Sequence, residues 1–220
     1  MNFSTPTLVI NKTISLNNLD RMIDVAKKNN LSLRPHFKTH QSIEIGNWFK
    51  EKGVTSITVS SISMAEFFSS VWNDITIAFP LNILEIDKLN LMIRGNRVKL
   101  LIDSISSLKV LDSQLGDAVE VFLKIDVGYN RAGLKVEEKE KIKSFIEFCN
   151  TSKNITFLGF LAHFGDSYKS RNKTEIKNVF QKSINKIEVL NIDFPSYQVS
   201  IGDTPTSSTI EKYPDFVNEI

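Results

Sequence analysis

The sequence predicts an α/β fold, specifically a (β/α)8 TIM-type barrel whose last strand is incomplete. Strand and helix patterns alternate along the chain in units of roughly 20–30 residues, as expected for a parallel sheet with helical crossovers. Several strand segments are continuous β-branched and apolar runs, typical of strands buried on both faces. Seven strands can be counted from residue 31 onward, and residues 213–220 resemble the start of another. No G-x-G-x-x-G segment follows a strand, which disfavours a dinucleotide-binding doubly wound sheet.

The predicted helices have apolar residues at helical spacing. Gly53 and Gly95 follow two of them and are typical helix-ending residues. Ser63, with Glu66 three residues later, predicts a capping box at the start of another. The predicted helices are residues 14–29, 43–52, 63–71, 83–94, 104–114, 137–149 and 174–190.

The predicted strands are short, apolar and rich in β-branched residues. Pro35 is awkward within the first of them, because proline has no N–H for a sheet hydrogen bond. The predicted strands are residues 31–38, 56–60, 75–79, 98–102, 119–127, 155–160 and 197–201.

Composition excludes several classes of protein. Of the 220 residues, 41% are hydrophobic and 24% charged, values typical of a folded globular chain. The 27 basic and 25 acidic residues nearly cancel, which gives no support for a partner that is a nucleic acid or a membrane. The single cysteine, Cys149, excludes an internal disulfide framework and cysteine-based zinc clusters. With no signal peptide and no apolar run near the ~18–20 residues of a membrane span, we expect a soluble, cytoplasmic protein.

In such a barrel, functional residues follow the carboxyl ends of the strands. The first such segment is residues 34–40, RPHFKTH. Because residues two apart on a strand face the same way, His36, Lys38 and His40 would share one side. A buried lysine has a lowered pKa and is a typical Schiff-base nucleophile. The spacing alone equally allows a surface turn with a solvated lysine.

Three further segments carry polar residues after a strand. In residues 124–133, Arg131 could bind an anionic oxygen and Gly133 allows close backbone approach, or this is an ordinary turn with a surface arginine. Residues 159–168 contain His163, which alone could equally be structural. Residues 200–206, SIGDTPT, offer hydroxyl and backbone N–H groups suited to phosphate, or a plain helix cap near Thr204.

Together these segments resemble the fold-type III pyridoxal-phosphate (PLP) enzymes. They are most similar to the D-serine dehydratase and D-threonine aldolase group, which shares the alanine racemase N-terminal barrel. The matching stretches occur in family order and span nearly the whole chain. They are residues 5–9, 34–40, 126–133, 162–168 and 200–206.

The resemblance implies a role for each candidate residue. Lys38 would hold the cofactor as a Schiff base and later remove the substrate α-proton. Arg131 would contact the cofactor's phenolic oxygen or the substrate carboxylate, and His163 would line the cofactor or substrate face. His40 would keep the Lys38 amine partly neutral by charge repulsion. The implied catalytic residues are Lys38, Arg131 and His163, and the implied cofactor-binding residues are Lys38, His40, Arg131, His163, Tyr168, Gly202, Asp203 and Thr204.

The implied activity is that of a PLP-dependent lyase acting on D-3-hydroxy amino acids, of the D-serine dehydratase or D-threonine aldolase type. Its partners would be a small amino-acid substrate and a second copy in a homodimer. The alternatives are an amino-acid racemase or a non-catalytic PLP-binding protein on the same barrel. A metallohydrolase using the three histidines and Asp126 is disfavoured, because Lys38 would repel a cation between two ligands.

Two departures from the family pattern matter. Leu161 stands where relatives often have a tyrosine. The family's C-terminal β-domain, which carries ligands for a zinc-like divalent metal, is expected to be absent, so no metal ligands are assigned here. Residues 1–12, with a strand at 7–10, would normally pair with that domain, and residues 13–220 would form the barrel. We therefore expect a fragment with impaired activity.

Overall fold

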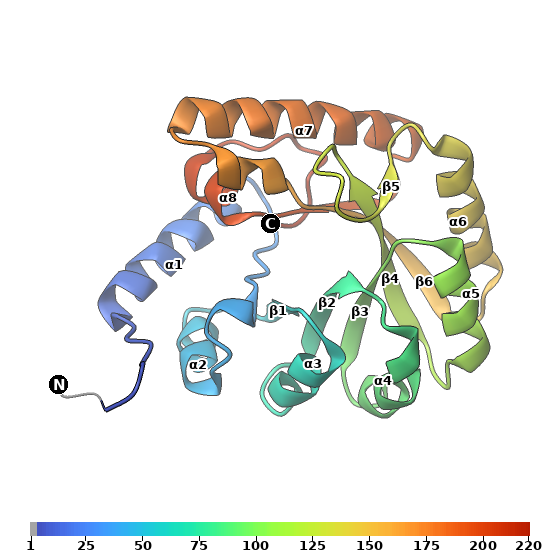
Figure 1. Ribbon diagram of the computed structural model, residues 1–220, viewed down its shortest axis with the longest axis horizontal. Helices are drawn as coiled ribbons and strands as arrows, with labels where there is room; N and C mark the ends of the chain where they lie inside the picture. Colours follow the sequence, from blue (N-terminus) through green and yellow to red (C-terminus); the bar gives the residue numbers. More distant parts are fainter. Residues whose placement is uncertain (1–3) are drawn as a thin grey trace.

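The fold is built on a parallel sheet of six strands that curls into a half-barrel, with helices along its outer side (Figure 1). The structure is a computed structural model and describes residues 4–220. A short strand, β5 (Leu134–Lys135), pairs with β4 beside this sheet. In sheet order the six strands are β1 (Ser56–Val59), β2 (Asp74–Pro80), β3 (Arg97–Ile102), β4 (Val119–Asp126), β6 (Ile155–Ala162) and β7 (Gln198–Ile201).

Each predicted helix is present with shifted ends, and one is preceded by a separate turn. The capping box predicted at Ser63 is wrong, because the helix begins earlier: Ser61 is its N-cap and accepts the Met64 N–H at 3.1 Å. The helices are α1 (Lys12–Lys28), α2 (Ile43–Glu51), α3 (Ile62–Ser69), α4 (Ile86–Ile93), α5 (Ile105–Gln114), α6 (Lys139–Thr151), α7 (Lys173–Asp193) and α8 (Thr204–Thr209), with 3-10 turns η1 (Phe37–Thr39), η2 (Ile83–Glu85) and η3 (Gly165–Lys169).

The strand predicted for residues 31–38 does not form as a regular strand. Ser32 and His36 instead make isolated parallel bridges, to Glu219 and Thr58. Pro35 has no N–H to donate, although its carbonyl accepts the Thr58 N–H at 2.9 Å. The chain therefore follows the path of a strand but turns into η1 at its end.

The last strand, predicted to be incomplete, is reduced to bridges as well. Glu219 bridges both Ser200 on β7 and Ser32. Its carbonyl accepts the Ile201 N–H at 3.0 Å, and the Ile220 N–H reaches the Ser32 carbonyl at 3.0 Å. These bridges join the two edges of the half-barrel, so the fold is an incomplete TIM-type barrel, as the sequence predicts.

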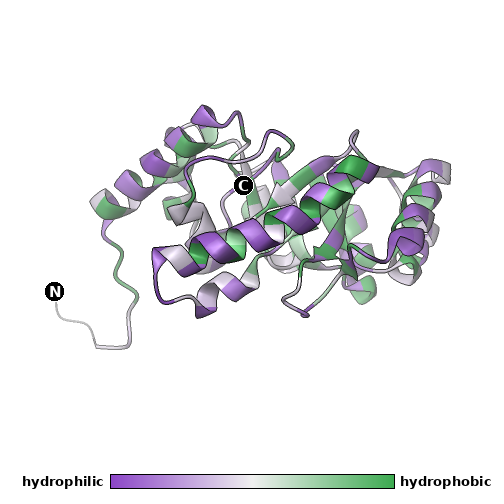
Figure 2. Ribbon diagram, turned by 90° about the horizontal axis from the view of Figure 1, so that it is seen from above, coloured by the Kyte–Doolittle hydropathy of each residue, from purple (hydrophilic) through white to green (hydrophobic). Residues whose placement is uncertain are grey.

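The core lies between the sheet and its helices. Strand residues such as Ile57, Ile75 and Val121 are fully buried there, and helix residues such as Leu108 and Ile187 pack against the same core. Figure 2 shows helices striped green and purple, as expected for helices with one apolar face on a sheet. Within residues 4–220, no helix is long and apolar enough to cross a bilayer.

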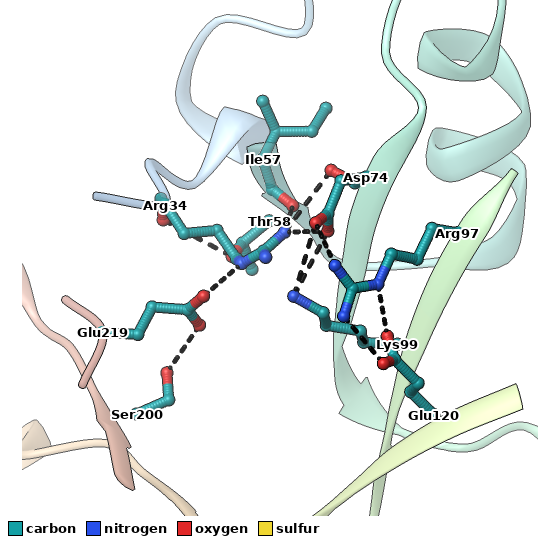
Figure 3. A network of polar contacts seen from close by, with 9 residues as sticks. All are labelled: Arg34, Ile57, Thr58, Asp74, Arg97, Lys99, Glu120, Ser200 and Glu219. Carbon is teal, nitrogen blue, oxygen red and sulfur yellow. Dashed lines mark hydrogen bonds and ion pairs between the residues drawn. The ribbon is translucent and has the colours of Figure 1, made fainter. Parts of the chain in front are cut away.

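A network of charged side chains lines the amino-end mouth of the barrel (Figure 3). Arg34 is buried and donates to Asp74 and to Glu219, each at 2.6 Å. Ser200 donates to the other Glu219 oxygen at 2.9 Å, and Lys99 lies 3.3 Å from Asp74. Arg34 thus ties β2 to residue 219, and both to the segment that leads into η1.

Candidate active site

Lys38 lies in η1 at the rim formed by the carboxyl ends of the strands. The turn starts at His36, whose Nδ1 accepts the Lys38 N–H at 3.2 Å. Phe37 anchors the turn on its outer side, where its ring packs edge-on against Phe49 and Trp72, each at 5.3 Å between centroids. Lys38 itself is exposed, which matches the solvated turn that the spacing also allowed and not the buried lysine. The reason is the 3-10 turn, which places Lys38 at an open rim rather than within a strand.

His36 points to the same end of the barrel as His163. Its Nε2 lies 3.4 Å from the Ser60 hydroxyl, at the end of β1. Burial, with the charges of Lys38 and His163, lowers the pKa of His36 to about 4. The ring is therefore neutral near pH 7.

His40 lies away from the candidate site, which corrects the expectation that it neighbours the Lys38 amine. Its ring centroid is 4.5 Å from that of Phe37 and 5.9 Å from that of Phe49. Its Nδ1 accepts the Ser42 N–H at 3.2 Å, and burial lowers its pKa. The alternation expected of a strand fails because η1 rotates the chain. His40 is part of the packing behind the turn.

The end of β4 contributes a buried cation that the sequence analysis missed. Lys124 is buried, and its Nζ donates to the Ile125 carbonyl at 3.3 Å. Burial, with the nearby charge of Arg131, lowers the pKa of Lys124 to about 8, although Asp126 opposes this. The available signal was its spacing of two from Asp126, which puts both side chains on one side of the strand.

Glycine is required where the next loop returns over this strand. Gly133 has φ +105°, and a Cβ there would lie 2.6 Å from the Lys124 carbonyl oxygen. This confirms the close backbone approach expected at Gly133. Asp126 shapes the loop by accepting the N–H groups of Gly128 at 2.9 Å and Asn130 at 3.0 Å.

Arg131 stands over an aromatic ring that the sequence did not single out. Its guanidinium carbon lies 5.5 Å from the centre of the Tyr129 ring. That ring is edge-on to His163 at 6.0 Å and packs on Gly165, where a Cβ would be 2.5 Å from it. Tyr129 therefore supplies an aromatic contact to His163.

His163 joins the ends of β6 and β7. Its Nδ1 lies 2.7 Å from the Gly202 carbonyl oxygen. Because a carbonyl only accepts, Nδ1 carries the proton and Nε2 is left as an acceptor in the neutral ring. Burial, with the charges of Arg131 and Lys124, lowers the pKa of His163, although the Gly202 hydrogen bond opposes this.

Asp203 is a helix cap in this structure. Its carboxylate accepts the Thr206 N–H at 2.9 Å and the hydroxyls of Ser167 and Thr206. The Asp203 carboxylate is thus used to start α8, one residue before the cap considered at Thr204. Phosphate contacts at this turn would have to come from backbone and hydroxyl groups.

Tyr168 and Gly202 leave such groups in reach. The Tyr168 hydroxyl accepts the Thr204 N–H at 3.3 Å and lies 3.5 Å from the Thr204 hydroxyl. A Cβ built at Gly202 would meet no atom within 4 Å, so there is room beside this turn. The His163 and Tyr168 ring centroids are 5.9 Å apart.

The structure therefore brings most of the predicted site together at one end of the barrel, with His40 excluded. Across residues 4–220, no group of three or more His, Cys, Asp or Glu side chains is arranged to hold a metal. Fold and candidate site together define an α/β-barrel protein with cationic, imidazole and hydroxyl groups gathered where its strands end.

Comparison with known proteins extends this assignment. The alanine racemase N-terminal domain family matches residues 12–215, and the chain belongs to this family. It is 30% identical to D-serine dehydratase from Dictyostelium discoideum, over 94% of this chain and 58% of that protein.

Solved structures of related enzymes have the same fold as this chain. D-threo-3-hydroxyaspartate dehydratase from Delftia sp. HT23 superposes with a TM-score of 0.87 at 26% identity, over 99% of this chain and 59% of that one. D-threonine aldolase from Filomicrobium marinum shares the fold, with a TM-score of 0.80 at 19% identity over 98% of this chain and 61% of that one. The chain thus spans about 58–61% of the length of these relatives.

Proposed function

We propose that this chain is the barrel of a PLP-dependent lyase that acts on D-3-hydroxy amino acids. The observation that carries the proposal is that the Lys38 turn and the Gly202 turn lie at the same rim, where the strands end. His36 caps the Lys38 turn by accepting the Lys38 N–H at 3.2 Å, and its Nε2 lies 3.4 Å from Ser60 at the end of β1. His163, at the end of β6, donates to the Gly202 carbonyl at 2.7 Å. A primary amine and an anion-binding turn are the two groups that a phosphorylated aldehyde requires. The relatives named as dehydratases support the choice of reaction.

The residues present fit this cofactor. The open space beside Gly202 is bordered by the Thr204 and Tyr168 hydroxyls and suits a phosphate. Hydroxyl and backbone N–H groups can bind a phosphate without a charged side chain. Arg131 makes no ion pair with any residue in 4–220, so its planar donors remain for a phenolic oxygen or a substrate carboxylate. When bound, the cofactor would supply the electron sink for the carbanion at the substrate α-carbon.

The chain's own groups would then bind and move protons. Lys38 Nζ would hold the cofactor and accept the α-proton of the substrate. Arg131 would orient the substrate carboxylate, and its charge beside Lys124 favours an anion at this edge. His163, fixed with its proton on Nδ1, would present Nε2 as an acceptor toward the cofactor or substrate face.

A non-catalytic PLP-binding protein is the second candidate. The exposure of Lys38 favours it, because an exposed amine is poorly shielded from water during proton transfer. A racemase has less support, since the relatives reported above are named as dehydratases and an aldolase. A homodimer, a cytoplasmic location, and a divalent metal in a form with the C-terminal domain also remain proposals. The division into residues 1–12 and 13–220 also remains a proposal. The strand expected at residues 7–10 does not form in this structure.

The test is chemical trapping of the cofactor. The purified chain is mixed with PLP, reduced with borohydride and digested, and the modified peptide is identified by mass spectrometry. We expect modification at Lys38 and its loss in Lys38→Ala. No adduct, or an adduct only at other lysines, would contradict the proposal. Release of a keto acid and ammonia from D-serine would then distinguish the lyase from the carrier.

A further inference from the structure

We propose that His36 is a positioning residue that holds the Lys38 turn in its reactive orientation through a neutral imidazole ring. The inference rests on the proposed function and adds a residue to it that the family resemblance does not assign. It depends on two contacts of one ring, one to the turn and one to β1.

The first contact sets the turn. His36 has an extended backbone (φ −92°, ψ 114°), and its Nδ1 accepts the Lys38 N–H at 3.2 Å. This is the arrangement of an N-cap, in which a side-chain acceptor two or three residues back satisfies a free N–H. The backbone direction of Lys38, and hence the start of its side chain, is fixed by this acceptor.

The second contact fixes the ring to the barrel. Since an amide N–H can only donate, Nδ1 is unprotonated and the neutral ring carries its proton on Nε2. Nε2 lies 3.4 Å from the Ser60 hydroxyl, which can accept that proton. The backbone of His36 also bridges Thr58. His36 therefore links the Lys38 turn to the end of β1 at two points, one through its ring and one through its backbone.

The charge state that this link requires is supported by its surroundings. The titratable groups that face His36 are Lys38 from its own turn and His163 from the end of β6. Burial disfavours a positive charge on the ring most, and these two groups add to this. Protonation of Nδ1 would remove the acceptor of the Lys38 N–H and place a cation beside the amine. The neutral ring keeps the turn formed without that charge.

Asparagine provides a matched substitution. Its Oδ1 is bonded to Cγ, as Nδ1 is in histidine, so His36→Asn keeps an acceptor near the same place. His36→Leu has similar bulk and no acceptor, and His36→Gln moves the acceptor one bond further out. The rate of borohydride-trapped PLP adduct at Lys38 is measured for each, with the exposed Lys109 as the internal reference for nonspecific labelling.

We expect Lys38 labelling to slow on the order of fivefold in His36→Leu, as for loss of one hydrogen bond, and to be largely restored in His36→Asn. Lys109 labelling should not change. Imidazole nitrogen NMR of the unsubstituted chain should show His36 protonated on Nε2 at neutral pH. Circular dichroism checks folding, and His36→Gln replaces the leucine variant if that variant does not fold.

Three results would overturn the role of His36. They are wild-type labelling rates in His36→Leu or its glutamine replacement, equal slowing in the leucine and asparagine variants, and a proton on Nδ1. If the unsubstituted chain gives no adduct at Lys38, the proposed function fails first, and the positioning role fails with it. The two failures are thus distinguishable.

Discussion

Two glycines in the site region have opposite surroundings at the residue scale. Gly133 combines φ +105° with backbone 2.6 Å from a would-be Cβ, whereas a Cβ at Gly202 would touch nothing within 4 Å. The first glycine is required by the fold. The second is required only if a ligand occupies the space beside it. Substitution of Gly133 should therefore change the stability of the fold, and substitution of Gly202 should change ligand binding.

Gly133→Ala is expected to destabilise the chain by about 2–4 kcal/mol, because the methyl group meets backbone that cannot move cheaply and the residue must keep a positive φ. Urea unfolding measures the effect. Gly95→Ala is the control, since a Cβ there meets no atom within 4 Å and no positive φ is required. A Gly133 variant as stable as the Gly95 variant would contradict the structure.

Gly202→Ala should leave the unfolding free energy unchanged, within about 0.5 kcal/mol, yet weaken PLP retention. The added methyl group would occupy the space that we assign to the phosphate. Equilibrium dialysis with PLP, followed by trapping at Lys38, measures the retention. Unchanged retention in a stable variant would show that the phosphate does not rest at this turn.

His36 also predicts a pH dependence of stability. Its pKa is about 4 in the folded chain against an ordinary 6.5, so the unfolded chain binds more protons between these values. The unfolding free energy should therefore fall as the pH is lowered from 6.5 toward 4. Because His36→Asn lacks this group, its stability should fall less over the same window in urea titrations. If the unfolding free energies of the two proteins fell equally with pH, the lowered pKa of His36 would be contradicted.

At the scale of elements, α8 depends on one carboxylate. Asp203 accepts the Thr206 N–H and two hydroxyls, which joins the helix start to Ser167 of η3. Asp203→Ala should cost about 1–2 kcal/mol or more, the usual cost of a lost N-cap, in urea unfolding. Asp166→Ala, which removes only a surface ion pair with Lys169, should cost less than about 1 kcal/mol. Equal costs would argue against the cap.

Sequence patterns predicted most elements because helical periodicity and buried strands leave clear signals. The failures occur where local hydrogen bonds override the pattern. Pro35 and the His36 cap convert the end of a predicted strand into η1, which separates Lys38 from His40. A helix cap near Thr204 was one of two readings that the sequence left open, and the structure has the cap one residue earlier, at Asp203. Tyr129 carried no signal, since its position depends on Gly165 from a distant segment.

At the scale of the whole molecule, buried charges hold the two edges of the sheet together. Glu219→Ala would leave Arg34 buried with one partner fewer, and should cost about 3–5 kcal/mol. The control is Glu120→Ala, whose partner Arg97 is largely exposed, with an expected cost of at most about 1 kcal/mol. Both are measured by urea unfolding. Equal, small losses of unfolding free energy in the two variants would show that the network of Figure 3 does not hold the two edges of the sheet together.

Counting strands in the sequence predicted the fold class. It did not predict how the two edges of the sheet are joined. The tail pattern at residues 213–220 indicated a strand, but only pairing across the barrel shows that Glu219 contacts both Ser32 and Ser200. Arg34 was visible in the first motif, yet its partner at position 219 has no local signature. Long-range ion pairs cannot be read from spacing, because they depend on which elements the fold brings together.

The joint between residues 32–36 and 218–220 has a consequence for how the chain reaches this shape. The Arg34–Glu219 pair is separated by 185 positions in sequence. Contacts this distant form late, because the loop-closure entropy must be overcome first. During synthesis, the segment that carries Lys38 would leave the ribosome long before its partner exists. The segment that leads into the Lys38 turn would therefore be joined to residue 219 only late in folding.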